Sequence, residues 1–470
     1  MMTMSDTICA PATPVGSGAV SVVRVSGPKA MACADALVRF RRGRARDSKG
    51  YEVKYGEIKG LDQVLVCLFR APHSYTGEDG FEISCHASPY VVSEIISRLC
   101  ELGCRMAEPG EFTRRAFLNG KMDLAQAEAV ADLIAADSQA AHRLAYSQLK
   151  GRYSDEFKKL RAQMVELASL VELELDFSEE EVEFADRDRL ACILSQARAR
   201  IEALKASYRI GNAVRSGVPV AIAGAPNSGK STLLNALLCE DRAIVSPIPG
   251  TTRDTVEETM VLGGVRYRFI DTAGIRESSD TVERLGIERS LEKLRTASIV
   301  IGVVDATASP EKLRESARSL AAELSHDQKL ILALNKTDLP GAKELHPEGL
   351  SAFLSASFSL LGDGRPRLFV VRISALTGAG LDELREAIES CGYGIGEGES
   401  AIVTSARHYS ALCEAAESLS LAQKALEDCL PGDLLAEDLR AAISSLGSIF
   451  GEITTDELLG NIFEHFCIGK

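Results

Sequence analysis

The stretch that decides the fold of this 470-residue chain runs Gly224-Ala225-Pro226-Asn227-Ser228-Gly229-Lys230-Ser231. It fits the phosphate-binding pattern GxxxxGK[ST], and it lies between an expected strand, Val218–Ala223, and an expected helix, Thr232–Leu238. Its glycines let backbone N–H groups wrap around phosphates at a helix N-terminus, where the helix dipole also favours anions. Lys230 should therefore reach the terminal phosphates of a nucleotide, and Ser231 should ligate Mg²⁺.

Four further motifs follow the phosphate loop in order. They are Gly250-Thr251-Thr252-Arg253-Asp254, Asp271-Thr272-Ala273-Gly274, Asn335-Lys336-Thr337-Asp338 and Ser374-Ala375-Leu376. The last three follow expected strands at Val265–Ile270, Lys329–Leu334 and Leu368–Ile373. Any one motif could arise by chance, but all five in this order indicate a GTP-binding domain.

Each motif suits one part of GTP. Thr252 should bind Mg²⁺ from a switch loop, and Asp271 should hold the same ion through water. The amide of Gly274 can reach the γ-phosphate. The Asp338 carboxylate can accept two hydrogen bonds from the amidine edge of guanine, which adenine cannot supply.

The expected GTP contacts come from the phosphate loop, the two switch segments and the two base-binding motifs. They comprise Asn227, Ser228, Gly229, Lys230, Ser231, Thr232, Ser246, Pro247, Ile248, Pro249, Gly250, Thr251, Thr252, Asp271, Thr272, Ala273, Gly274, Asn335, Lys336, Asp338, Ser374, Ala375 and Leu376.

The catalytic group is less obvious from the residues alone. Many signalling GTPases place a Gln directly after the DxxG glycine to orient the attacking water. Here that position is Ile275, which cannot orient water. The candidates nearby are Arg276, Glu277 and Glu283, although each could equally be an exposed helix charge.

The distribution of residue types along the chain predicts an α+β protein of several domains. Short β-rich segments at Ala19–Val25, Gln63–Phe69 and Phe81–Cys85 favour an N-terminal α/β domain at 1–120. Helical spacing with almost no Gly or Pro predicts a helical domain, divided between 121–215 and 393–470. Strands alternate with helices across 216–392, which predicts a P-loop domain with a mostly parallel sheet, inserted into the helical domain.

Composition limits the possible functions. The 53 basic and 67 acidic residues give a net charge of −14, so the chain is not expected to coat nucleic acid by bulk charge. The 12 cysteines include no CxxC pair, and we expect Cys100 and Cys104 to be buried thiols, not a metal site. No secretion signal or membrane-spanning run is visible, so we expect a cytoplasmic protein with no membrane association.

Motifs outside the nucleotide site resemble those of the MnmE (TrmE) family of tRNA-modifying GTPases over nearly the whole chain. They include Ala12-Thr13-Pro14-Val15-Gly16, Val23-Arg24-Val25-Ser26-Gly27, Ser74-Tyr75-Thr76-Gly77-Glu78-Asp79, Glu108-Pro109-Gly110-Glu111-Phe112-Thr113, Leu118-Asn119-Gly120-Lys121-Met122-Asp123-Leu124 and Phe466-Cys467-Ile468-Gly469-Lys470. Other GTPase families lack both the N-terminal set and this ending.

The resemblance implies an N-terminal domain that dimerises and binds a tetrahydrofolate one-carbon carrier. By motif position, Arg24, Glu82 and Lys121 would contact the folate, with Lys470 nearby. Cys467 matches the terminal cysteine of the family, and no role is assigned to it.

The resemblance also implies that K⁺ replaces an arginine finger in GTP hydrolysis. The matching K⁺ ligands are Asn227, Ser246, Ile248 and Thr251, and two GTPase domains would meet across this ion. The catalytic glutamate of the family falls on Glu283, which would orient the attacking water.

The partner implied is MnmG, a flavoprotein that carries FAD, forms a heterotetramer with this chain and supplies much of the tRNA surface. Together they would add an aminomethyl or carboxymethylaminomethyl group to carbon five of the wobble uridine. Two features depart from the family pattern. His86-Ala87-Ser88 replaces a common His-Gly-Gly, and the segment Leu339–Pro366 is longer than expected.

Two other functions are compatible with part of the sequence. A regulatory GTPase switch in ribosome assembly would explain the nucleotide motifs, but it would not need a folate site. A folate-dependent transferase with a vestigial GTPase domain would not need the intact nucleotide motifs.

Overall fold

The structure is a computed structural model of the whole chain. It describes residues 6–14, 16, 18–176, 187–239, 258–270, 294–325, 328–342, 368–392, 401–428, 430, 432–452, 456–464 and 466–470. The chain divides into two compact units, considered one at a time below. The first comprises Met1–Ile134, Tyr146–Glu202 and Ser410–Lys470, and the second comprises Ala135–Ala145 and Ala203–Tyr409. The domain boundaries expected at 120, 215 and 392 stay predictions.

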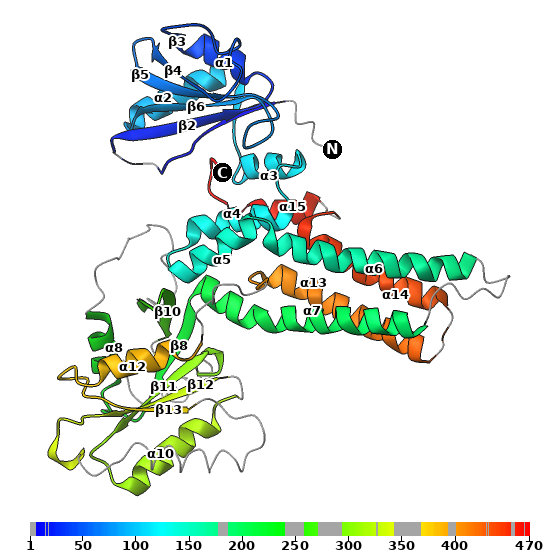
Figure 1. Cartoon of the computed structure of the whole chain (residues 1–470). Coiled ribbons are helices and arrows are strands. Elements are labelled where there is room, and N and C mark those ends of the chain that lie inside the picture. Colours follow the sequence, from blue (N-terminus) through cyan, green and yellow to red (C-terminus); the bar gives the residue numbers. More distant parts are fainter. Residues whose placement is uncertain are drawn as a thin grey trace, which may run out of the picture. The chain divides into compact units, whose positions relative to one another are not determined.

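A seven-stranded sheet forms the N-terminal part of the first unit (Figure 1). Its strand order is β3-β4-β5-β6-β2-β1-β7, and all neighbours are antiparallel except β1 and β7. The bounds are β1 Thr7–Pro11, β2 Val20–Ser26, β3 Arg39–Phe40, β4 Glu52–Ile58, β5 Asp62–Phe69, β6 Gly80–His86 and β7 Cys104–Met106. The three strands expected from the sequence are confirmed as β2, β5 and β6.

One face of this sheet is covered and the other is open. Helices α1 (Ala30–Leu37) and α2 (Pro89–Glu101) supply apolar side chains to a core shared with the alternate residues of the strands. The other face leaves Val53, Tyr55 and Leu65 exposed. Strict alternation along β4 and β5 produces these two faces, because successive side chains of a strand point in opposite directions.

The cysteine expectation is wrong for Cys100, which is exposed at the end of α2. Cys104 is buried in β7, and its Sγ lies 3.6 Å from Sγ of Cys33. Burial and the neighbouring Cys104 raise the pKa of the Cys33 thiol to about 12. This thiol is therefore protonated near neutral pH.

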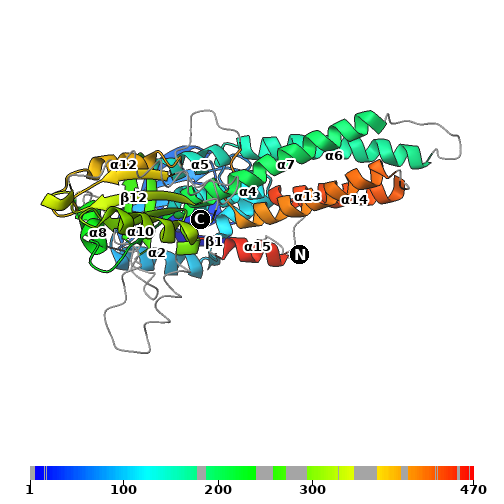
Figure 2. The same ribbon diagram turned by 90° about the horizontal axis from the view of Figure 1, so that it is seen from below.

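Long helices make up the rest of the first unit. Their bounds are α3 Glu111–Leu118, α4 Leu124–Ala135, α5 Gln139–Leu149, α6 Arg152–Asp176, α7 Arg187–Ser216, α13 Ala406–Glu427, α14 Gly432–Phe450 and α15 Asp456–Phe463, with α4, α5, α7 and α13 also contributing residues to the second unit. Helices α6 and α14 lie side by side along their length (Figures 1 and 2). The expected packing of helices from before and after the inserted domain is confirmed here.

The second unit contains a six-stranded sheet of order β13-β12-β11-β8-β10-β9. All pairs are parallel except the β9–β10 hairpin. The strands are β8 Val218–Ala223, β9 Glu258–Leu262, β10 Val265–Ile270, β11 Ile299–Asp305, β12 Lys329–Asn335 and β13 Leu368–Arg372. The mostly parallel sheet expected from the sequence is confirmed.

Helices cover both faces of this sheet. Helix α10 (Pro310–Ala322) packs on one face, and α8 (Lys230–Cys239) and α12 (Leu381–Glu389) pack on the other (Figure 1). A short helix, η2, spans Pro340–Ala342. Strands β8, β11 and β12 are almost entirely apolar because both of their faces are buried. In such sheets, ligands bind beyond the carboxyl ends of the strands.

Within the described ranges, no helix is both long enough and apolar enough to cross a lipid bilayer.

Candidate functional site

The phosphate loop connects the carboxyl end of β8 to the start of α8. A side chain at Gly224 would place a Cβ 2.2 Å from the carbonyl oxygen of Val303, and its φ is +155°. Gly229 has a φ of +98°, and a Cβ there would lie 2.2 Å from Nδ2 of Asn335. Both positions therefore require glycine, as the sequence pattern predicts.

Polar groups of this loop suit a bound phosphate. The ammonium group of Lys230 lies over the loop and donates to the carbonyl oxygens of Gly224 and Ala225, at 2.9 and 3.0 Å. The hydroxyl of Ser228 is buried, and it has no hydrogen-bond partner among the described residues. Helix α8 begins at Lys230, so its first amides point toward the loop. These groups fit the phosphates of a nucleotide.

Asn335 ties the phosphate loop to the base-binding segment. Its side chain is 3% exposed at the end of β12. Its Nδ2 donates to the carbonyl oxygen of Ser228 at 2.8 Å, and its Oδ1 accepts from the backbone N–H of Ala375 at 2.9 Å. One amide thus joins three motifs, with Ser228 107 positions before Asn335 and Ala375 40 positions after it.

Asp338 and Ser374 come together at the same edge of the sheet. The Ser374 hydroxyl donates to Oδ1 of Asp338 at 2.7 Å and accepts from the backbone N–H of Thr377 at 3.2 Å. The hydrogen bond from Ser374 therefore fixes one of the two carboxylate oxygens of Asp338. Leu376 is 80% exposed beside it, where an apolar side chain can cover a purine ring.

Asp305, which the sequence did not single out, holds Lys336. It ends β11, and its Oδ2 accepts from the Lys336 ammonium at 2.6 Å. Burial raises the pKa of Asp305, but the hydrogen bonds from Lys336 and Thr307 outweigh burial and keep that pKa below its usual range. The backbone of Lys336 has a φ of 68°, which is uncommon for a residue other than glycine. The ion pair with Asp305 holds the side chain of this lysine in place.

The two switch segments lie outside the described residues. They carry the expected positions Ser246, Pro247, Ile248, Pro249, Gly250, Thr251, Thr252, Asp271, Thr272, Ala273, Gly274 and Glu283, together with Ile275, Arg276 and Glu277. Most of the segment Leu339–Pro366 also lies outside the described residues.

A second cluster of expected residues lies in the first unit. Arg24 and Glu82 are cross-strand partners on β2 and β6, and Nε of Arg24 donates to Oε1 of Glu82 at 2.8 Å. Nη1 of Arg24 donates to the carbonyl oxygen of Gly469 at 3.1 Å. The guanidinium also lies 5.6 Å from the ring centroids of both Tyr75 and Phe112. Arg24 therefore connects the sheet to the C-terminal tail.

The C-terminal tail docks on the start of α3. The backbone N–H of Phe112 donates to the carbonyl oxygen of Lys470 at 3.2 Å. The N–H of Gly110 lies 3.5 Å from the carbonyl oxygen of Cys467, whose side chain is exposed. Because Gly469 contacts Arg24, the backbone of Lys470 also lies close to that arginine. Lys121 is anchored separately, because its ammonium donates to the carbonyl oxygen of Pro72 at 3.0 Å.

Sequence reasoning missed a buried ionic network beneath this cluster. The side chain of Arg115 is 2% exposed and forms ion pairs with Asp6, Glu78 and Glu111. Burial raises the pKa of Glu111, but the bonds from Arg105, the Glu108 backbone and Arg115 outweigh it and hold that pKa below its ordinary value. The only sequence signal was a dense charge pattern around the Glu108–Thr113 motif.

His86 directly precedes Ala87 and Ser88, the two residues that depart from the His-Gly-Gly pattern of the family. Its Nδ1 lies 2.7 Å from Oδ1 of Asp62, and its backbone N–H donates to Oδ2 of the same carboxylate at 2.8 Å. Burial raises the pKa of Asp62, but these contacts with His86 outweigh it and lower that pKa overall. The Asp62 carboxylate thus fixes the end of β6 and the start of the altered segment.

The phosphate loop, the paired base-binding motifs and the parallel sheet define a guanine-nucleotide-binding protein of the P-loop GTPase class. The comparisons with known proteins carry the identification further. The family model described as the GTP-binding protein TrmE N-terminus matches residues 7–121. The model described as the MnmE helical domain matches residues 124–467.

Curated relatives agree along the full length. The tRNA modification GTPase MnmE of Bacteroides thetaiotaomicron is 46% identical and aligns with 99% of this chain and 99% of its own. Those of Christiangramia forsetii and Porphyromonas gingivalis are 45% and 47% identical, covering 100% and 99% of this chain and 100% and 98% of their own. The chain belongs to the MnmE family.

Among solved structures, the G domain of the T. maritima FeoB iron transporter is 30% identical over 37% of this chain and 98% of that chain, with a TM-score of 0.27. The family assignment rests on the sequence matches alone.

Proposed function

We propose that this protein hydrolyses GTP in the cytoplasm to drive modification of tRNA, together with the flavoprotein MnmG. The product would carry an aminomethyl or carboxymethylaminomethyl group on carbon five of the wobble uridine. The observation that carries the proposal is the Asn335 side chain, which joins the phosphate loop to the segment in which Ser374 binds Asp338. Such an arrangement selects guanine and positions its phosphates at the same time.

Recognition of guanine would depend on Asp338. Ser374 occupies its Oδ1, so the carboxylate cannot rotate freely. Its remaining lone pairs can accept from the N1–H and the exocyclic amine of guanine. Lys336, held by Asp305, would lie along the ring, and Leu376 would cover it.

Hydrolysis would depend on Mg²⁺, K⁺ and Glu283. Ser231 and Thr252 would ligate Mg²⁺, and Asn227, Ser246, Ile248 and Thr251 would ligate K⁺. Asn227 has a φ of 61° and an exposed side chain at the tip of the phosphate loop, which suits a ligand directed away from the loop. When bound, K⁺ would supply positive charge to offset the negative charge that develops on the phosphates during hydrolysis. Glu283 would orient the water, a role that Ile275 cannot fill.

The Arg24 cluster fits a tetrahydrofolate one-carbon carrier. Glu82 has a second carboxylate oxygen that can accept from the pterin amine, and Arg24 fixes the first. Lys121 and Lys470 supply positive charge for the glutamate tail of a folate. When bound, the carrier would supply the one-carbon unit that is transferred to the uridine. The residues of this chain would bind and orient it.

The open face of the N-terminal sheet favours a homodimer. On this face Val20, Val53, Tyr55 and Leu65 are 61%, 64%, 44% and 49% exposed, and Tyr51, just before β4, is 73% exposed. Contiguous exposed apolar side chains on a sheet commonly mark an interface. We propose that a second copy covers this face, which would join two folate sites into one dimer. MnmG, carrying FAD, would bind this dimer to form the heterotetramer.

The test is reconstitution of the modification with purified protein, MnmG, FAD, GTP, a methylene-tetrahydrofolate donor, ammonium and unmodified tRNA. Mass spectrometry of the nucleosides should detect the aminomethyl uridine, and Arg24→Ala should abolish it while GTP turnover stays normal. Arg98→Ala, in a half-buried ion pair on α2, serves as the control. If GTP is hydrolysed but no complete mixture yields modified uridine, a regulatory switch becomes the better account.

A further inference from the structure

A cavity of about 560 Å³ lies in the second unit, at the edge of the sheet opposite the phosphate loop. It is lined by residues at the amino ends of three strands: Pro219 in β8, Ser298 before β11 and Gln328 before β12. The phosphate loop follows the carboxyl end of β8, a strand of 6 residues. A strand of that length spans about 20 Å, so the cavity is separate from the nucleotide site.

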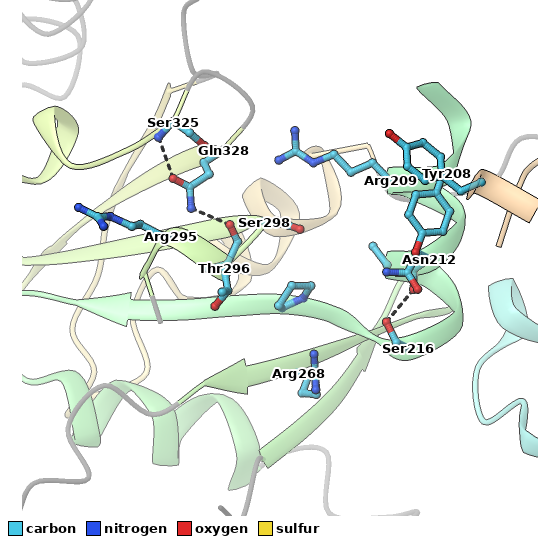
Figure 3. A pocket seen from close by; sticks show the side chains of 14 residues that line it. Tyr208, Arg209, Asn212, Ser216, Arg268, Arg295, Thr296, Ser298, Ser325 and Gln328 are labelled. Atoms are coloured by element: carbon cyan, nitrogen blue, oxygen red, sulfur yellow. Dashed lines mark hydrogen bonds between the residues drawn. The ribbon is translucent and has the colours of Figure 1, made fainter. Parts of the chain in front are cut away.

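The described lining of the cavity carries three cationic side chains. Arg209 on α7, Arg268 on β10 and Arg295 before β11 all line it. Among the described residues that line the cavity, none is acidic. This concentration of positive charge lies in a chain with a net charge of −14. Figure 3 shows Arg209 projecting from α7 into the space that faces Gln328 and Ser298.

Neutral hydrogen-bonding groups surround the three arginines. Asn212 and Ser216 lie on the same face of α7 as Arg209, three and seven positions further along. Thr296, Ser298 and Ser325 add hydroxyl groups from the opposite wall (Figure 3). Guanidinium groups and hydroxyls together bind tetrahedral oxyanions, because a guanidinium donates in a fixed planar fork and hydroxyls complete the shell.

The wall that carries Arg295 is rigid. Gln328 is 2% exposed, and its Nε2 donates to the carbonyl oxygens of Leu294 and Ala297 at 2.5 and 2.7 Å. Its Oε1 accepts from the backbone N–H of Ser325 at 2.9 Å. One buried amide therefore fixes both segments of this wall, including the backbone on either side of Arg295.

The wall that carries Arg209 is also fixed. Tyr208 and Tyr409 stack with ring centroids 4.5 Å apart and an interplanar angle of 19°. At Gly211, a Cβ would lie 2.1 Å from the carbonyl oxygen of Val403, so only glycine permits this close approach. The Ser207 hydroxyl accepts from the N–H of Val403 at 3.1 Å. The arginines are thus presented by a preformed frame, which reduces the entropy lost when a ligand binds.

We propose that this cavity is a second anion site and that it binds a phosphate group. Its volume falls in the range of small-molecule sites, about 300–1,000 Å³. It can therefore admit a phosphorylated small molecule or a segment of RNA backbone. Both sources offer the same group to the arginines. Bulk charge disfavours RNA binding by this chain, so an RNA contact would have to be local, as it is here.

The experiment uses the full-length protein with GDP and Mg²⁺ saturating the nucleotide site. Inorganic pyrophosphate is titrated by calorimetry, and a fluorescein-labelled single-stranded RNA of eight nucleotides is titrated by anisotropy. Arg209→Gln and Arg295→Gln each remove one exposed charge from the cavity. Arg215→Gln, on the same helix but outside the cavity, is the matched control. Unaltered GDP affinity in every variant establishes that the second unit is folded.

Wild-type protein and Arg215→Gln should bind at least one probe saturably, and each cavity variant should weaken that binding by about tenfold or more. Arg209→Lys, which keeps the charge but not the fork, should recover part of the loss. Weakened pyrophosphate binding would identify a phosphorylated small molecule as the ligand, and weakened RNA binding alone would identify tRNA backbone. Binding of neither probe, or equal binding by the cavity variants and Arg215→Gln, would overturn the proposal.

Discussion

Replacing Asn335 with alanine should uncouple the phosphate loop from the base-binding segment. The substitution removes both the donor to the Ser228 carbonyl and the acceptor for the Ala375 N–H. Ser228 and Ala375 are 3% and 5% exposed, so water replaces the lost partners poorly. A buried polar group left without a partner costs about 1–3 kcal/mol, which gives a total of about 2–6 kcal/mol.

The loss should fall mainly on nucleotide binding, because the two contacts join the two halves of the nucleotide site. At the lower limit of about 2 kcal/mol, GDP affinity should decrease by about 30-fold. Calorimetric titration with GDP measures the affinity. Urea unfolding measures how much of the energetic cost lowers the free energy of unfolding instead. Asn235→Ala, at an exposed position on α8, is the control, with an expected change below about 0.5 kcal/mol. An Asn335→Ala protein with wild-type GDP affinity and wild-type unfolding would refute the reasoning.

Three further predictions concern single carboxylates. Asp338→Asn should weaken GTP binding by about tenfold or more and admit xanthosine nucleotides, since the amide presents a donor where guanine also donates; continued exclusion of xanthosine triphosphate in a competition titration would argue against the assigned role. Glu283→Ala should reduce GTP turnover by about a hundredfold or more with nearly unchanged GTP affinity, and unchanged turnover would remove Glu283 from the mechanism. Glu111 has a pKa below its ordinary 4.5, so its stabilisation is complete above that value and is lost as the pH falls below it. The free energy of unfolding, measured with urea at about pH 7 and about pH 4, should therefore decrease less in Glu111→Gln than in wild type. Equal decreases in the two proteins would contradict a stabilising role of the network.

Much of the GTPase fold could be predicted from local sequence. Strands β8 and β10 have the bounds that the sequence predicts, because the apolar run of β8 lies between Gly217 and Gly224, and the alternating strand β10 begins directly after Gly264. Strand β11 ends at the polar residue Asp305, one residue beyond its apolar run. That last residue belongs to the strand because it pairs with Asn335 in the parallel register, and a pairing between strands cannot be inferred from one strand alone.

The rest of the site depends on contacts between distant residues. Arg115 reads as one charge among many in the sequence, yet its partners Asp6 and Glu78 lie 109 and 37 positions away. The docking of the tail on α3 joins positions more than 350 residues apart, and only the family motifs suggested that Lys470 lies near Arg24. The different burial of Cys100 and Cys104 could not be predicted from the sequence either. Helix α2 ends between them, and only Cys104 enters the core.

The most direct test of the proposed hydrolase is GTP turnover in K⁺ buffer against Na⁺ buffer at matched ionic strength. Strong stimulation by K⁺, lost in Asn227→Ala, is expected if the ion completes the catalytic site between two GTPase domains. Equal rates in the two buffers would contradict the potassium mechanism and favour a regulatory switch.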